Sequence, residues 1–329
     1  MRQWFVRCFL VLLGTLLFPL NAPAPLIFRP GEGWTYERVG EGKWRRTRAK
    51  DQLEVAQKAF DERDYGTALK AARRTVTQWS FSDYAPQAQY LLGRCYEAKK
   101  QDERAFLQYQ RLLEKYPKVD NYQEVLQRQF GIANRFLAGQ WFRFMGYIPF
   151  FPSMSKTVEM YQKLIKNGPY SEVAPQSQLN IGKAREKQSD YPAAVKAYEL
   201  AADRYHDQKA VASDALYKAG LAYYKQAKTS EYDQNVAAKA IETFSYFITL
   251  YADDGRVPEA QKLINALKTE QARGSFEIAR YYEKKRRWNG ALIYYNEVVN
   301  KDPESKLAEE AKQRFDSIKK RAGQPVAQK

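Results

Sequence analysis

The residue types that most often perform chemistry are few and scattered in this sequence. It holds two cysteines, Cys8 and Cys95, and a single histidine, His206, so no set of soft ligands has the spacing of a metal site. The adjacent carboxylates Asp253 and Asp254 are expected to be solvated charge on a turn. No glycine-rich phosphate loop, nucleophile elbow or HExxH motif occurs. We therefore expect no enzymatic activity, no cofactor and no metal.

Charge is the next property that could attract a ligand. The formal net charge is +16, which would favour nucleic acid, anionic lipid or acidic proteins as partners. The lysines and arginines are spread through the whole chain, and no nucleic-acid-binding motif accompanies them, so we expect no nucleic acid. An anionic membrane surface fits better, and general solubility is the alternative explanation.

What the sequence repeats is a helical hairpin with a period of roughly 34 residues. A small residue is followed after twelve positions by a second, after four more by an aromatic, and after eight more by proline or its equivalent. The clearest copy has Gly93, Ala105, Tyr109 and Pro117. The marks of the other copies are Gly131 and Tyr161; Gly182, Ala194 and Tyr198; Gly220, Ala240 and Phe244; and Ala279, Ala291, Tyr295 and Pro303.

This pattern has a physical reason in the packing of short antiparallel helices. A small residue such as Gly93 lets the second helix of the hairpin approach, and Tyr109, one turn beyond Ala105, fills the gap. Pro117 ends the second helix because it lacks an amide proton. The pattern predicts an all-α tetratricopeptide-repeat solenoid of about six hairpins over residues 51–322, with a C-terminal capping helix from Ser305 to Arg321. Residues 323–329 are expected to be a disordered tail.

The N-terminal segment, residues 1–24, is expected to direct export. Arg2 and Arg7 precede an apolar run from Cys8 to Leu20, which suits a signal peptide and is short for a membrane span. A small residue at Ala24 could end it, but Pro25 would hinder cleavage. A cleaved signal peptide and an uncleaved anchor both stay open.

Residues 25–50 have the composition of a Pro/Gly/basic linker. At its end, a basic surface segment is formed by Lys43, Trp44, Arg45, Arg46 and Arg48. Basic groups beside an aromatic suit a lipid or polyanion surface, and a solvated lead-in to the first helix is the alternative.

The third hairpin carries an insertion that is rich in large apolar groups. Its aromatic residues are Trp141, Phe142, Phe144, Tyr147, Phe150 and Phe151. A turn of this composition packs back on the solenoid, docks a partner protein or enters a membrane interface. The residues alone leave these three possibilities open.

The last hairpin, Phe276 to Leu292, contains Ala-Arg-Tyr-Tyr, a basic turn and Trp-Asn-Gly-Ala. With the hairpin from Ala56 to Ala72 and the connector from Ser82 to Gln89, it resembles the BamD-like family of outer-membrane protein assembly factors, over roughly Gln52 to Arg321. The resemblance implies an exported periplasmic scaffold at the outer membrane that contacts components of the β-barrel assembly machinery or incoming precursors.

The early cysteine departs from that family's pattern. Family members carry a lipidated cysteine after the apolar run, whereas Cys8 stands at its start, so lipidation is not expected from this N-terminus. Two alternatives to the assembly role remain: a general cell-envelope scaffold in division or wall machinery, and a peripheral binder of anionic lipid or wall polymer.

Overall fold

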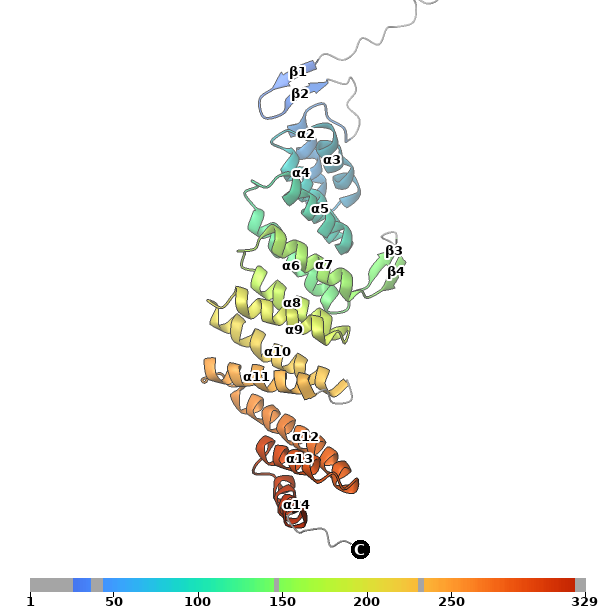
Figure 1. The fold of residues 1–329 in the computed structure, drawn as a ribbon. Helices are drawn as coiled ribbons and strands as arrows, with labels where there is room; N and C mark the ends of the chain where they lie inside the picture. Colours follow the sequence, from blue (N-terminus) through green and yellow to red (C-terminus); the bar gives the residue numbers. More distant parts are fainter. Residues whose placement is uncertain (1–25, 37–43, 145–147, 230–233, 323–329) are drawn as a thin grey trace, which may run out of the picture. The chain divides into compact units, whose positions relative to one another are not determined.

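The computed structural model describes residues 26–36, 44–144, 148–229 and 234–322. Within these ranges the chain forms thirteen α-helices and two short β-hairpins (Figure 1). The expected signal or anchor segment, Lys43, Tyr147 and the C-terminal tail lie outside the described residues.

Contacts divide the chain into two compact units, residues 1–125 and 126–329. The first holds β1 (Leu26–Arg29), β2 (Gly33–Tyr36), α2 (Ala49–Asp61), α3 (Tyr65–Gln78), α4 (Ala85–Ala98) and α5 (Asp102–Lys115). Helix α6 (Tyr122–Leu137) begins in the first unit and continues into the second. The second unit then holds β3 (Phe142–Phe144), β4 (Ile148–Phe151), α7 (Met154–Asn167), α8 (Ala174–Lys187), α9 (Tyr191–Arg204), α10 (Lys209–Thr229), α11 (Gln234–Leu250), α12 (Val257–Lys284), α13 (Trp288–Lys301) and α14 (Lys306–Ala322).

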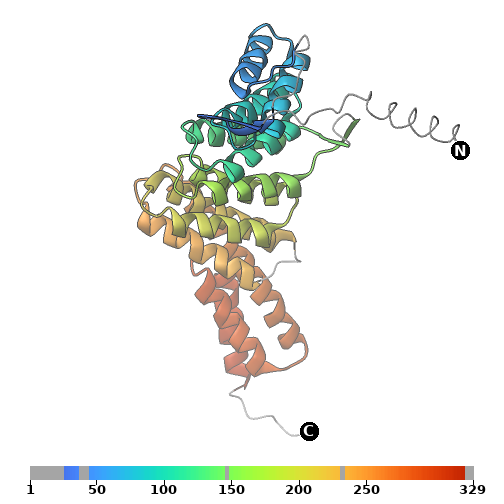
Figure 2. The ribbon, with the colours of Figure 1, turned by 90° about the horizontal axis from the view of Figure 1, so that it is seen from above.

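Successive helices pair as the repeat predicts. The pairs are α2 with α3, α4 with α5, α6 with α7, α8 with α9, α10 with α11, and α12 with α13. The two helices of the last pair lie side by side in both ribbon views (Figures 1 and 2), and α14 packs on them. The expected fold, six helical hairpins followed by a terminal helix, is confirmed.

Four of the hairpins turn in the same way. Arg63, Lys100, Ser189 and Arg286 each follow the first helix of a pair and have φ of 62°, 54°, 59° and 56°. A left-handed residue at this position lets the backbone amides that follow the helix donate to carbonyls of its last turn, and the chain reverses within three residues.

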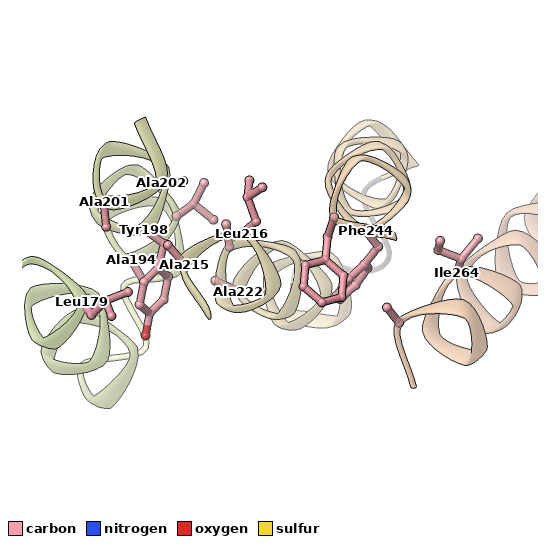
Figure 3. Close-up of a cluster of buried hydrophobic side chains, with 14 residues drawn as sticks. Leu179, Ala194, Tyr198, Ala201, Ala202, Ala215, Leu216, Ala222, Phe244 and Ile264 are labelled. Atoms are coloured by element: carbon pink, nitrogen blue, oxygen red, sulfur yellow. The ribbon is translucent and has the colours of Figure 1, made fainter. Parts of the chain in front are cut away.

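In every hairpin after the first, the core is built around one fully buried aromatic of the second helix; in the first hairpin Ala72 takes that place. Tyr198 and Phe244 are fully buried, and Figure 3 shows them in one cluster with small residues such as Ala194 and Ala222. A Cβ atom on Gly182 would lie 2.3 Å from the ring of Tyr198. The small residue is therefore required because the ring occupies the place of its side chain.

In the third hairpin the small mark is two residues later than expected. A Cβ on Gly131 would lie 3.9 Å from the end of the Arg135 side chain and meet nothing closer. In three other hairpins, an aromatic three residues before the small mark contacts the buried ring: Tyr90 with Tyr109, Tyr217 with Phe244, and Phe276 with Tyr295. Here that aromatic is Phe130, 6.2 Å from Tyr161, which assigns the mark to the fully buried Ala133.

Helix α12 is longer than the repeat predicts. It continues for 28 residues, about 42 Å at 1.5 Å per residue. Its first half packs Ala260 and Ile264 in a cluster with α10 and α11, and its second half packs Phe276 and Ala279 against α13. One uninterrupted helix thus takes part in both hairpin contacts.

The expected linker contains a β-hairpin. Leu26–Arg29 pairs antiparallel with Gly33–Tyr36; Gly31, in the turn, and Gly33, the first residue of the second strand, have φ of 78° and 74°. These left-handed values explain the two glycines, because other residues rarely adopt them. The interpretation of residues 25–50 as one extended linker is wrong for this part.

Candidate protein-binding groove

A groove runs between the first helices of the first two hairpins. It encloses about 830 Å³ and lies within the first unit. Its lining includes Leu53, Glu54, Gln57 and Phe60 of α2, Gln87, Tyr90, Leu91 and Arg94 of α4, and Lys118, Val119 and Asp120 of the segment after α5. The position of this groove follows from the repeat. Helices α2 and α4 are the first helices of successive hairpins, they present corresponding faces, and they contact each other.

Arg94 is held between two aromatic rings of this groove. Its guanidinium carbon lies 5.3 Å from the centroid of the Phe60 ring and 5.8 Å from that of Tyr90. The Nη1 atom donates to the Tyr90 hydroxyl at 3.4 Å, and that hydroxyl donates to the Glu124 carboxylate. Cation–π contacts of this kind restrict the side chain before a ligand arrives, which lowers the entropy cost of binding.

No carboxylate in the described ranges forms an ion pair with Arg94. The groove's acidic groups, Glu54, Asp83 and Asp120, lie beside two cations, Arg94 and Lys118. The surface is therefore mixed in sign, unlike the strongly basic chain as a whole. Apolar side chains, aromatic faces and charges of both signs suit a segment of protein better than a polyanion.

In the aromatic insertion of the third hairpin, some aromatic side chains are packed in the interior and others are exposed. It forms β3 and β4, an antiparallel pair between α6 and α7. The ring of Phe142 is buried and stacks on Phe136 with centroids 4.1 Å apart, while Lys156 Nζ lies 4.9 Å from its centroid. Phe142 is thus a packing residue, and its assignment to a partner or membrane contact is wrong.

The other aromatics of the insertion have different positions. Trp141 and Phe151 are exposed, at 53% and 41%. Phe144 and Phe150 lie on β3 and β4. Contact of these four residues with a partner or a membrane stays a prediction.

Trp44, in the basic surface segment, does not present a free aromatic group. Its ring packs against the core of the first unit, and its carbonyl accepts from the buried amide of Gln52 at 3.0 Å. The same Gln52 side chain accepts from the Arg46 backbone at 2.9 Å. Arg45 and Arg48 remain exposed at the surface. The expectation of a basic and aromatic lipid surface is wrong for the aromatic part. The Trp44 ring packs against the core, and the Gln52 side chain holds the Trp44 backbone beside α2.

The residues that could perform chemistry stay apart in the fold. Within the described ranges, no cluster of three or more His, Cys, Asp or Glu side chains could hold a metal ion. Cys95 is a buried free thiol, and burial raises its pKa to about 12. Each helix in the described ranges is too short or too polar to cross a membrane.

The sequence did not single out Phe60, Tyr90 or Arg94. A signal for Tyr90 does exist, because aromatics recur three residues before the small mark of several hairpins. Phe60 and Arg94 come from different hairpins, so their proximity depends on packing of α2 against α4.

Comparisons with known families divide the chain between two models. Residues 152–329 match the YfiO family, described as outer membrane lipoprotein, and residues 53–120 match a tetratricopeptide-repeat model. No curated protein matches the sequence.

The chain is similar to several solved structures. The C-terminal part of a TPR repeat-containing protein from Cytophaga hutchinsonii is 15% identical, with 80% of this chain and 87% of that chain covered and a TM-score of 0.37. The apo form of RapI is 15% identical, with coverages of 82% and 99% and a TM-score of 0.32. A tetratricopeptide repeat protein from Parabacteroides merdae is 12% identical, with coverages of 82% and 98% and a TM-score of 0.34.

Proposed function

The chain belongs to the YfiO family of outer membrane lipoproteins, and from this we propose that it is a non-catalytic periplasmic scaffold that binds proteins during assembly of β-barrels into the outer membrane. The family description supports the location, and the tetratricopeptide repeats support protein binding. That no lipid is attached at Cys8 stays a prediction.

The observation that carries the proposal is the groove between α2 and α4. Its half-buried Arg94, held by the half-buried rings of Phe60 and Tyr90, offers a cation beside aromatic surface to one ligand segment. A helix or an extended strand of a partner would lie along the groove, with its apolar groups against the half-buried Phe60 and Tyr90. The packed hairpins keep the two walls at a fixed spacing, so binding requires little rearrangement.

The scaffold role follows from the same arrangement. A repeat array displays side chains on a stiff support and needs no moving parts to present them. Partners are expected to be assembly components or unfolded barrel precursors, since both expose segments of mixed apolar and charged character. An anionic membrane surface is a further expected contact.

Affinity isolation of the full chain tests this proposal. The tagged protein is recovered from gently solubilised envelopes, and co-purifying proteins are identified by mass spectrometry. Barrel assembly components or precursors should be recovered with the wild type and depleted with the double variant Phe60→Ser/Arg94→Gln. The matched control is Lys70→Gln, an exposed cation on α3 of the same unit. Recovery of wall or division proteins alone would contradict the assembly role and support the general envelope scaffold.

A further inference from the structure

The β1–β2 hairpin carries an exposed aromatic pair. Phe28 and Trp34 stand directly opposite each other in the strand pairing, with ring centroids 5.4 Å apart. They are 57% and 67% exposed, although each has a large apolar surface. An exposed pair of this size at a fixed place indicates a contact surface rather than part of the core.

The hairpin is fastened to the helices of the first unit by its turn. The Gly31 carbonyl accepts from the backbone amide of Asp83 at 2.7 Å, and a Cβ on Gly31 would come within 3.1 Å of the Asp83 carboxylate. The side chain of Glu32 is buried, 3.9 Å from the guanidinium of Arg48. The aromatic pair therefore has a defined position on the first unit.

We propose that Phe28 and Trp34 lie in the headgroup region of a lipid bilayer and hold the first unit against the membrane. Trp is enriched at this depth because its indole combines an apolar ring with a polar N–H group, and the Phe28 ring beside Trp34 adds apolar surface. The pair takes the role that the sequence assigned to Trp44, whose ring packs on the core instead. This inference rests on the proposed location at the outer membrane and not on the groove.

The chain before β1 favours lipid as the occupant. The apolar run from Cys8 to Leu20 ends six residues before Leu26, so the two are separated by about 20 Å at most. As an uncleaved anchor, that run would bring its membrane beside the hairpin. The exposed Arg48, whose guanidinium lies 3.9 Å from Glu32 of the hairpin turn, and the exposed Arg45, three residues before it in the chain, carry positive charge that complements anionic headgroups.

Fluorescence quenching by lipid tests the inference on the full chain. The protein is added to vesicles of phosphatidylethanolamine and phosphatidylglycerol whose acyl chains are brominated next to the headgroups, and quenching of tryptophan emission is compared among variants. The test variant is Trp34→Phe, and the matched control is Trp141→Phe, which removes another exposed tryptophan. The remaining tryptophans, including Trp4, contribute to both variants alike.

The lipid-quenched fraction of the emission should fall in Trp34→Phe and should not fall in Trp141→Phe. An unchanged fraction in Trp34→Phe, on protein that floats with the vesicles, would overturn the inference and leave the proposed location standing. Wild-type protein that does not float with the vesicles would overturn both. Flotation that persists unchanged in Phe28→Ser/Trp34→Ser but is lost in the exposed-aromatic control Phe81→Ser would also overturn the inference.

Discussion

The ring of Tyr109 occupies the place that a side chain on Gly93 would need. A Cβ atom on Gly93 would lie 2.2 Å from Tyr109 Cε1 and 2.6 Å from Cδ1, closer than real atoms approach. The ring is fully buried and its hydroxyl donates to the Glu97 carboxylate at 2.7 Å, so it has little room to move. This contact packs α4 closely against α5 and so fixes the position of the helix that carries Tyr90 and Arg94 of the groove.

Gly93→Ala should destabilise the protein. The added methyl must displace a fully packed ring, and overpacking of this kind costs about 1–3 kcal/mol. Gly131→Ala is the matched control, since its Cβ meets no atom nearer than 3.9 Å. Removing a glycine from an open helix position should raise the free energy of unfolding by up to about 1 kcal/mol. Urea unfolding followed by circular dichroism measures both. Equal losses in the two variants would contradict the assignment of the third mark to Ala133.

The buried tyrosine hydroxyls should differ in their contribution to stability. Tyr109→Phe removes a hydrogen bond to a carboxylate and should cost about 1.5–3 kcal/mol. The hydroxyl of Tyr198 is buried without a hydrogen-bond partner among the described residues, and burial raises its pKa, so the group stays neutral. Tyr198→Phe should therefore change stability by less than about 1 kcal/mol, or increase it. The urea midpoints of the two variants report the difference, and a larger loss in Tyr198→Phe would refute this account.

Asp254 should make stability depend on pH in acid. Hydrogen bonds from Arg256, whose guanidinium also bonds Asp214 at 2.9 Å, hold the pKa of Asp254 well below its usual range. Because the folded pKa is the lower one, the stabilisation is present above the unfolded value of about 3.9 and is lost as pH falls below it. Asp254→Asn should cost about 1.5–3 kcal/mol at pH 7 and lose less on acidification than the wild type. Asp253→Asn, at the exposed neighbouring carboxylate, is the control, and an equal acid response in both variants would be inconsistent with the prediction.

The insertion of the third hairpin should respond differently at two adjacent positions. Phe142→Ala removes a buried ring that stacks on Phe136 and should cost about 3–5 kcal/mol. Trp141→Ala, at an exposed position, should change stability by less than about 0.5 kcal/mol. Thermal unfolding of both variants checks this, and a stable Phe142→Ala protein would show that the ring is not part of the packing.

Much of the fold was predictable because its signals are local. The spacing of Gly93, Ala105 and Tyr109 reports the contact of one helix with the next, and the same spacing returns at Gly182, Ala194 and Tyr198. In the third copy the small mark was assigned to the wrong residue, because Gly131 is a small residue but lies on a face of α6 that does not contact the buried ring.

Three features were not predicted: the length of α12, the β1–β2 hairpin and the groove between α2 and α4. Helix α12 has no small and aromatic marks in its first half, so its length was not predicted. The turn containing Gly31 and Gly33 was interpreted as a linker, although glycine at a turn between two short apolar runs is also typical of a β-hairpin. The groove depends on α2 packing against α4, which no single hairpin encodes.

The central claim, that the groove of the first unit binds protein segments, is tested most directly by site-specific photo-crosslinking in intact cells. A photoreactive residue is placed at Gln87, which is exposed and lines the groove, and separately at Arg111, an exposed residue of α5 outside it. The account predicts crosslinks from Gln87 to barrel assembly components or precursors, lost in the Arg94→Gln background, and none from Arg111. No protein crosslink from Gln87, or equal crosslinking from both positions, would contradict it.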